Sequence, residues 1–282
     1  GLVKYCKLMK LKKRLEERLS DQELELLVGA YDIVGDIAII IIPEELEARE
    51  RLIAEAILSS NRKIHVVAKR AGQYGGEYRT IPLQILAGEN RKETEVKEFG
   101  IRLLVNPETV YYSVRSGNER KRIASLVEPG ETVLVLFSGV APFPLIISKY
   151  SKAKSIVGIE KNPEAYAYGI QNLCRNKKQK NIYLHLGDVR EVLPTLAITY
   201  DRVVMPLPTR AEEFLSCALP VLKAGGILHF YDMQRPEYFP QSIEKIVSAS
   251  AALNRTVISS TITKCGHCAP KIFRICIDAK IS

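Results

Sequence analysis

From Thr132 onward, short apolar runs alternate with segments whose apolar residues recur at helical spacing. This pattern predicts strands at 132–137, 155–160, 182–186, 202–205 and 226–231, helices at 142–150, 163–176, 189–196, 210–222 and 241–253, and β-like runs at 256–263 and 272–278. Such alternation indicates a parallel sheet covered on both faces, because the crossovers between parallel strands carry the helices. We therefore expect an α/β domain over residues 108–282, with a mostly parallel sheet and a terminal β-hairpin.

The chain before residue 108 has a less regular pattern. Helices are expected at about 9–27 and 44–58, and strands at 32–42, 64–68, 78–86 and 101–105. Pro43 ends the long apolar strand, since proline cannot donate to a sheet ladder. These elements predict a smaller α+β domain over residues 1–107.

Composition places the chain among folded globular proteins. Hydrophobic residues make up 46% of the 282 residues and charged residues 26%. The longest apolar run, Ile37–Pro43, is far too short to span a membrane. The basic N-terminal segment lacks an apolar core and a small-residue cleavage site, so we expect no signal peptide there and a cytoplasmic location. A net charge of +9 favours an acidic partner such as nucleic acid.

The six cysteines are too sparse for a disulfide scaffold. Cys265 and Cys268 flank His267, but no second pair has the spacing of a zinc site. We expect no metal and take this segment as a turn between the closing strands. Three further histidines are expected to be packed within strands: His65, His185 and His229.

A cofactor site is indicated where strand 132–137 runs into small residues and then a helix. Gly139 lets the backbone approach a ligand closely at the edge where open α/β sheets bind cofactors. Glu160 ends the next strand, where a carboxylate can accept hydrogen bonds from both ribose hydroxyls. Asp188 ends the strand after that, where adenine N6 would be recognised. The competing interpretation is that Gly139 only makes a tight turn and that Glu160 and Asp188 are surface acids. However, all three lie at the ends of successive strands, in the order expected of a nucleoside-cofactor site.

The missing third glycine and the missing Walker-type lysine favour S-adenosylmethionine over NAD or ATP. The expected cofactor-binding residues are Phe137, Ser138, Gly139, Val140, Glu160, Lys161, Asp188, Val189 and Pro206.

Over nearly its whole length the sequence resembles the archaeal and eukaryotic tRNA (guanine-37 N1) methyltransferases and the related aminocarboxypropyltransferases of wyosine synthesis. The resemblance is carried by Tyr31–Ala38, Tyr78–Thr80, Tyr112–Arg120, the Phe137–Phe143 turn and Cys265–Pro270. It implies a Rossmann-like class I methyltransferase domain and a tRNA substrate gripped at the anticodon stem-loop.

The resemblance also implies catalytic roles. Glu119 matches the carboxylate taken as the general base, and Arg115 and Arg79 match arginines that stabilise the reacting base. Neutral guanine carries a proton on N1, which a positioned carboxylate can remove. The negative charge then spreads towards O6, where a guanidinium can meet it.

Helical spacing would place Arg115, Glu119 and Arg122 on one face of a helix over residues 115–123. We expect Arg122 and Pro208 to contact the substrate. The competing interpretation of Arg115 and Glu119 is an ordinary surface ion pair, worth under about 1 kcal/mol.

The sequence departs from the family pattern at three places. Val135 stands where the first cofactor strand usually carries Asp, and Pro206 stands where the methyltransferases usually carry Asn. Proline has no amide with which to hold a base edge. The small extra N-terminal domain of many members is also expected to be missing. The aminocarboxypropyltransferases lack the same Asn and the same domain, but they usually lack an arginine at the position of Arg115.

We therefore expect a monomeric, S-adenosylmethionine-dependent tRNA (guanine-N1) methyltransferase, with no metal and no membrane association. Aminocarboxypropyl transfer on the same fold is the alternative. A third interpretation, a cofactor-binding RNA module without activity, rests on Val135 and Pro206.

Overall fold

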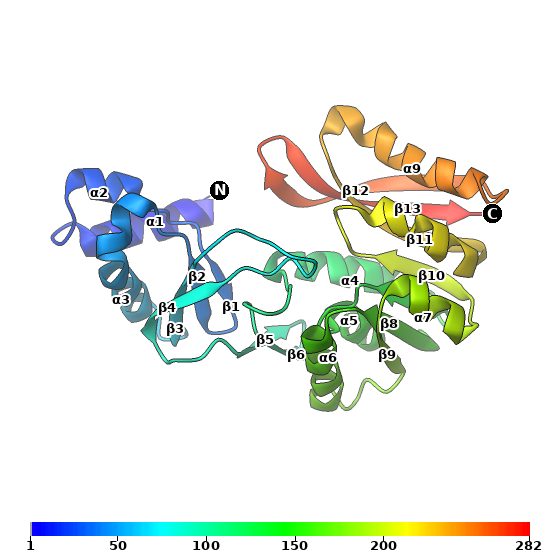
Figure 1. Ribbon diagram of the computed structural model, residues 1–282, viewed down its shortest axis with the longest axis horizontal. Coiled ribbons are helices and arrows are strands. Elements are labelled where there is room, and N and C mark those ends of the chain that lie inside the picture. The colour runs from blue at the N-terminus through cyan, green and yellow to red at the C-terminus, as the bar shows by residue number, and fades with distance from the viewer. Residues whose placement is uncertain (1) are drawn as a thin grey trace. The chain divides into compact units, whose positions relative to one another are not determined.

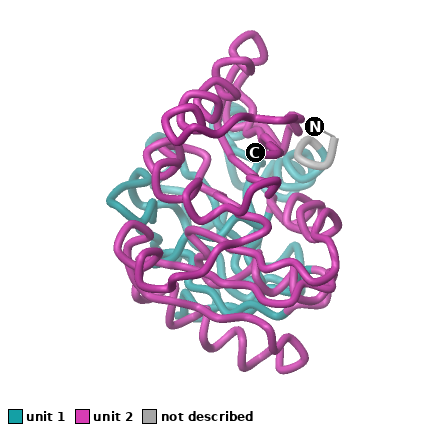
Figure 2. Tube along the Cα trace, turned by 90° about the vertical axis from the view of Figure 1, so that its right-hand side faces the viewer, with its two compact units in different colours: residues 1–98, 102–114 teal, residues 99–101, 115–282 magenta. Residues whose placement is uncertain are grey.

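The computed structural model describes residues 2–282, and the side chains of residues 6–282. The chain forms two compact units (Figure 2). Unit 1 comprises residues 1–98 and 102–114, and unit 2 comprises residues 99–101 and 115–282. The domain boundary expected after residue 107 falls inside the last segment of unit 1.

Unit 1 is built on a four-stranded sheet in the order β1-β2-β3-β4. Its strands are β1 (Asp32–Val34), β2 (Ile37–Ile40), β3 (Val66–Arg70) and β4 (Leu83–Gly88), and β5 (Thr94–Glu98) pairs separately with β6 (Ile101–Val105). Its helices are α1 (Leu2–Leu15), α2 (Asp21–Leu26), the 3₁₀ helix η1 (Glu44–Arg49) and α3 (Glu50–Ser60). Helices and sheet share one apolar core that includes Leu15, Ile53 and Val67.

Several elements of unit 1 differ from the sequence prediction. The strand expected over 78–86 begins only at Leu83, the helix expected over 44–58 starts as the separate 3₁₀ helix η1, and β5 was not expected. The single helix over 9–27 is wrong, because the Ser20 hydroxyl accepts a hydrogen bond from the Glu23 N–H and starts a new helix there. The single strand over 32–42 is also wrong. Gly35 turns the chain back with a φ of 58°, so that β1 and β2 form an antiparallel hairpin. A Cβ at Gly35 would lie 2.2 Å from the Thr94 hydroxyl, so only glycine fits.

Unit 2 contains a seven-stranded sheet in the order β12-β13-β11-β10-β7-β8-β9 (Figure 1). The strands are β7 (Thr132–Leu136), β8 (Ser155–Glu160), β9 (Ile182–Leu186), β10 (Tyr200–Met205), β11 (Leu222–Gln234), β12 (Val257–Ala269) and β13 (Ile272–Ile281). The helices are η2 (Val114–Ser116), α4 (Gly117–Leu126), α5 (Pro142–Tyr150), α6 (Pro163–Arg175), α7 (Val189–Leu196), η3 (Ala211–Phe214), α8 (Leu215–Ala218), η4 (Leu219–Val221), η5 (Pro236–Tyr238) and α9 (Phe239–Ala251).

The sheet of unit 2 is parallel except where β13 is inserted. Strands β11, β10, β7, β8 and β9 pair in parallel, and β13 runs antiparallel to both β11 and β12. The central strand β7 is buried at four of its five positions, as expected for a parallel strand covered on both faces. The predicted fold class is confirmed: a smaller domain is followed along the chain by a Rossmann-like α/β domain with a terminal hairpin.

Three smaller predictions need correction, two in unit 2 and one in unit 1. The segment from Cys265 to Ala269 is not a turn, because β12 continues through it and the chain reverses at Lys271, whose φ is 62°. The helix expected over 210–222 is broken into η3, α8 and η4 around Pro220. In unit 1, His65 is exposed rather than packed, and it bonds to Asp36.

Among the helices of residues 2–282, none has both the length and the apolar character needed to cross a membrane.

Candidate active site

The turn between β7 and α5 holds three residues in the left-handed backbone region. Phe137, Gly139 and Ala141 have φ angles of 54°, 57° and 74°. Only glycine adopts such angles without steric cost, so the other two positions are strained. The Ser138 N–H donates to the Ile159 carbonyl oxygen of β8 at 3.0 Å. The turn is thereby fixed at the carboxyl edge of the parallel sheet.

Glu160, the last residue of β8, faces this turn. Its Oε1 accepts a hydrogen bond from the Gly139 N–H and its Oε2 one from the Asn162 N–H, each at 2.9 Å. Burial raises the pKa of the carboxyl, and the backbone hydrogen bonds oppose that shift only in part. The structure therefore brings the predicted glycine and the predicted acid into direct contact.

Asp188 caps the N-terminus of α7, where its carboxylate accepts from the Arg190 N–H. The Arg190 guanidinium binds the same carboxylate at 2.8 Å, and Lys161 Nζ lies 3.3 Å away. The hydrogen bonds from Arg190 hold the pKa of Asp188 well below its usual range. The acid expected to recognise adenine is ionised and already pairs with two cations.

The other predicted cofactor residues differ in how their side chains are placed. Val140 and Val189 are buried in the core, so only their backbone atoms are available to a ligand. Phe137 is half-buried with its ring centroid 4.8 Å from that of Phe214, and Ser138 is 4% exposed. Lys161 is exposed. Beyond β10, Pro206 is half-buried and Pro208 is buried.

Glu119 lies in the first turn of α4, and only 8% of the residue is exposed. Its Oε1 accepts hydrogen bonds from the Tyr231 hydroxyl at 2.8 Å and from Arg122 Nη2 at 2.7 Å, and its Oε2 accepts from Arg122 Nε at 2.9 Å. Burial raises the pKa of Glu119, but the hydrogen bonds and the positive charge of Arg122, together with the hydrogen bond from Tyr231, outweigh burial and hold the pKa below its ordinary value. Glu119 is therefore a carboxylate, ready to accept a proton.

The predicted helical face of Arg115, Glu119 and Arg122 does not form as expected. Arg115 lies in the 3₁₀ helix η2, outside α4, and is exposed. A tighter 3₁₀ turn rotates side chains away from the α-helical spacing on which that prediction depended. Among the described contacts, the partner of Glu119 in α4 is Arg122, so a surface ion pair with Arg115 is not what holds the carboxylate.

Arg122, for which a substrate contact stays a prediction, joins two carboxylates in the structure. Besides Glu119 it donates to Asp278 on β13, with Nη1 at 2.7 Å from Oδ2 and Nη2 at 3.3 Å from Oδ1. Burial raises the pKa of Asp278, but hydrogen bonds from His229 and Arg122 reverse that effect and lower it. Arg122 thus binds both the buried Glu119 and the half-buried Asp278, and these two carboxylates hold it in place.

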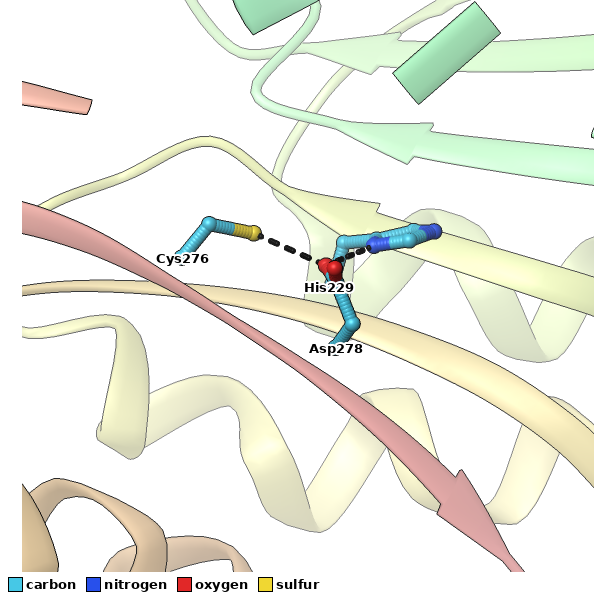
Figure 3. A group of neighbouring side chains, drawn as sticks. All are labelled: His229, Cys276 and Asp278. Atoms are coloured by element: carbon cyan, nitrogen blue, oxygen red, sulfur yellow. Dashed lines mark hydrogen bonds and ion pairs between the residues drawn. The ribbon is translucent and has the colours of Figure 1, made fainter. Parts of the chain in front are cut away.

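The chain of contacts continues from Asp278 to His229 on β11 (Figure 3). His229 Nδ1 lies 2.6 Å from Asp278 Oδ1, and Arg202 Nη1 lies 2.8 Å from His229 Nε2. A guanidinium can only donate, so Nε2 accepts and the ring proton is on Nδ1, which donates to Asp278. Burial lowers the pKa of His229 and keeps the ring neutral. Arg202 also binds Glu131 through Nε at 2.8 Å.

Tyr231 connects Glu119 to the cofactor turn. Its ring centroid lies 6.2 Å from that of Phe143, in the first turn of α5, with the planes 67° apart. The guanidinium of Arg120 lies 5.8 Å from the same Phe143 ring. Glu119 is therefore close to the segment that follows the Gly139 turn and does not face open solvent.

Arg79 belongs to unit 1, whereas Arg115 and Glu119 belong to unit 2. It has a left-handed φ of 54°, and its guanidinium lies 6.0 Å from the centroid of the Tyr111 ring. Such strain at a non-glycine residue is typical of functional segments. Its catalytic role stays a prediction.

Sequence reasoning missed Tyr231 and Asp278 and treated His229 only as a packed residue. One available signal was the spacing of polar residues in otherwise apolar strands. His229 and Tyr231 are two apart on β11, as are Cys276 and Asp278 on β13, so each pair points to one face of the sheet.

His229, Cys276 and Asp278 also have the types and proximity of a metal site, with their ligand atoms within 4.8 Å of one another (Figure 3). However, Arg202 occupies His229 Nε2 and Arg122 binds Asp278, so two guanidinium cations lie where a metal cation would be repelled. The group fits a buried ion-pair network better than a metal centre.

Comparison with known proteins gives the family context. The family model described as the TRM5/TYW2 methyltransferase domain matches residues 94–258, and one described as the TYW2 N-terminal domain matches residues 11–91. The chain is 35% identical to tRNA (guanine(37)-N(1))-methyltransferase Trm5b of Pyrococcus abyssi, over 93% of this chain and 78% of the relative. It is 30% identical to the tRNA(Phe) (4-demethylwyosine(37)-C(7)) aminocarboxypropyltransferase of Methanocaldococcus jannaschii, over 89% of this chain and 97% of the relative.

Solved structures agree with these matches. The crystal structure of Trm5b from Pyrococcus abyssi superposes with a TM-score of 0.85 at 33% identity, covering 94% of this chain and 78% of that one. A complex of aTrm5 with tRNALeu superposes with a TM-score of 0.80 at 32% identity, covering 95% of this chain and 76% of that one. TYW2 of Methanocaldococcus jannaschii in complex with AdoMet superposes with a TM-score of 0.70 at 25% identity, covering 90% of this chain and 99% of that one.

Proposed function

The chain belongs to the TRM5/TYW2 methyltransferase family, and on that premise we propose that it transfers the methyl group of S-adenosylmethionine to N1 of guanosine 37 in tRNA. The observation that carries the proposal is the ionised, nearly buried Glu119, fixed by Arg122 and Tyr231 beside the segment that follows the Gly139 turn. A carboxylate held in this way is suited to take a proton from a ring nitrogen.

The residues at the carboxyl edge of the sheet fit the cofactor. Glu160 offers an acceptor-only carboxylate to hydroxyl donors, and the Gly139 turn brings backbone close to it. The bound cofactor supplies an electrophilic methyl group on a positively charged sulfur. Glu119 accepts the N1 proton as the nitrogen attacks, and we assign Arg115 and Arg79 to the negative charge that develops on O6.

Aminocarboxypropyl transfer is the second candidate. It is supported by Pro206 at the position of the family Asn and by the 97% coverage of the aminocarboxypropyltransferase of Methanocaldococcus jannaschii. Retention of Arg115 supports methyl transfer instead.

The two reactions are separated by the position of the label in the cofactor. Two substrates are used: unmodified tRNA transcripts, and tRNA(Phe) that carries 4-demethylwyosine at position 37, the base in the name of the aminocarboxypropyltransferase relative. Each is incubated with S-adenosylmethionine labelled either in the methyl group or in the carboxyl carbon, and the nucleosides are then analysed. Methyl transfer puts only the methyl label into tRNA, as 1-methylguanosine. Incorporation of the carboxyl label would replace our proposal with the second candidate, and incorporation of neither label into any tRNA would favour a binding module.

We also propose that the protein acts as a monomer in the cytoplasm and binds the anticodon stem-loop without a metal. The net charge of +9 supports a phosphate-rich partner. Sedimentation of the protein alone and with tRNA tests the stoichiometry, and activity in excess chelator tests the independence from metal.

A further inference from the structure

Glu119 accepts hydrogen bonds from Arg122 of α4 and from Tyr231 of β11. Asp278 of β13 binds Arg122 in turn, and the thiols of Cys265 on β12 and Cys276 on β13 are near enough for the charge of Glu119 to raise their pKa values. Burial raises the pKa of Tyr231 well above its ordinary value and raises that of Cys265 to about 12, so both are neutral donors at physiological pH. Only Glu119, Arg122 and Asp278 carry charge in this group.

The hydrogen bonds distinguish the two oxygens of Glu119. A carboxylate oxygen has two lone pairs, and on Oε1 both are taken, by the Tyr231 hydroxyl and by Arg122 Nη2. Oε2 accepts from Arg122 Nε. The Cys265 thiol donates to a different acceptor, the Thr263 carbonyl oxygen, at 3.4 Å. Oε2 is therefore the oxygen on which an incoming proton can be placed.

The direction of each hydrogen bond explains why this arrangement is rigid. Arg202 donates to His229, His229 donates to Asp278, and Asp278 accepts from Arg122. No member of this series can reverse its bond, because guanidinium groups only donate and carboxylates only accept. Asp278 therefore orients the Arg122 guanidinium that binds Glu119.

We propose that Arg122, Tyr231 and Asp278 are positioning residues for the general base: they fix the Glu119 carboxylate so that Oε2 alone receives the proton of the substrate nitrogen. This inference rests on the proposed function and extends it by assigning Arg122 to the base rather than to the tRNA. The three residues act through Glu119 and touch neither substrate nor cofactor in this role.

The variant Tyr231→Phe tests the proposal with little change in shape. Removing the hydroxyl takes away one hydrogen bond that favours the ionised form of Glu119, so the pKa of Glu119 rises by about one unit. The acid limb of kcat against pH moves to higher pH by the same amount, because a protonated Glu119 cannot act as a base. The KM for S-adenosylmethionine stays within about twofold, since the hydroxyl is not placed in the cofactor site.

The matched control is Tyr200→Phe. Tyr200 lies on β10 of the same sheet and is 0% exposed, and its hydroxyl has no hydrogen-bond partner among the described residues. This variant also removes a buried tyrosine hydroxyl, but it leaves the acid limb and the pKa of Glu119 unchanged.

The variant Asp278→Asn tests whether the Asp278 carboxylate is needed to orient Arg122. The amide is nearly isosteric but neutral, and its N–H₂ cannot accept from a guanidinium. We expect kcat to fall about tenfold or more, with the KM for S-adenosylmethionine unchanged. A kcat within twofold of the unmodified protein would remove Asp278 from the proposal.

A readout independent of activity completes the test. The carboxyl carbon of Glu119 is followed by ¹³C NMR against pH in protein labelled at glutamate, with Glu119→Gln to assign the signal. Tyr231→Phe should raise the midpoint of this titration, and an unmoved midpoint overturns the positioning role. A raised midpoint with an unmoved acid limb would keep the network but remove Glu119 as the base, and the failure would then lie in the proposed function.

Discussion

The hydroxyl of Tyr231 donates a 2.8 Å hydrogen bond to Oε1 of Glu119, a residue 112 positions earlier in the chain. The contact joins the first turn of α4 to β11 of the parallel sheet. Since the Tyr231 ring also packs against Phe143, one side chain connects the candidate base with the segment after the cofactor turn. The predictions below follow from this arrangement.

Glu160→Gln should weaken cofactor binding about 10- to 100-fold. The variant keeps the shape but loses the charge that strengthens hydrogen bonds from hydroxyl donors, a loss of about 1.5–3 kcal/mol. Isothermal titration calorimetry with S-adenosylmethionine measures the change.

The control is Asp201→Asn. Asp201 also accepts a backbone N–H, that of Thr132 at 2.8 Å, but at the start of β7 and therefore at the opposite edge of the sheet. Its replacement should leave cofactor affinity unchanged. Equal weakening by both variants would show that Glu160 acts through fold stability and not through the cofactor.

Asp36→Asn should destabilise the protein at neutral pH and much less in acid. Hydrogen bonds from Arg91, and also from Thr94 and His65, lower the pKa of Asp36 to about 2 despite partial burial. A depressed pKa means that the stabilisation is present above the unfolded value near 3.8 and is lost as pH falls through about 2.

Urea unfolding at pH 7 and near pH 2.5 measures this difference. We expect the free energy of unfolding of the variant to be about 1 kcal/mol lower than that of the unmodified protein at pH 7, since solvent screens part of the interaction. This difference in free energy should become smaller in acid. If the variant and the unmodified protein differ in unfolding free energy by the same amount at both pH values, the ionic role of Asp36 is contradicted.

Arg202→Met should destabilise unit 2 by about 3–5 kcal/mol, because it leaves Glu131 without its buried cationic partner. The Arg202 side chain is 5% exposed and also donates to the Leu126 carbonyl oxygen. Thermal and urea unfolding report the change. Arg210→Met is the matched control, since the Arg210–Glu213 pair is 76% exposed at the arginine and should contribute little. Similar losses in both variants would argue against a special role for the buried pair.

The sequence was sufficient where local pattern determines structure. Alternating strands and helices predicted the parallel sheet, and the order of Gly139, Glu160 and Asp188 placed all three at its carboxyl edge. In unit 1 two local signals were passed over. Ser20 and Glu23 have the spacing of a helix cap, and Val34-Gly35-Asp36 is a turn between two strands.

The network around Glu119 could not be predicted in the same way. Arg122 meets Asp278 across 156 positions, and no local periodicity specifies which face of a helix meets which residues of a distant strand. Family resemblance identified Glu119, but its partners became visible only in the folded chain. The resemblance also identified Arg115, and helical spacing placed it on one face with Glu119 and Arg122, but Arg115 lies in the 3₁₀ helix η2 and not in α4.

The most direct test of the central claim is single-turnover methylation of unmodified tRNA by Glu119→Gln, with calorimetry of S-adenosylmethionine binding to the same variant. A glutamine cannot accept the N1 proton as a carboxylate does, so the rate of 1-methylguanosine formation at position 37 should fall by a factor of about 10² to 10⁴ while cofactor affinity is kept. A variant that binds the cofactor normally and methylates guanosine 37 at the full rate would contradict the account.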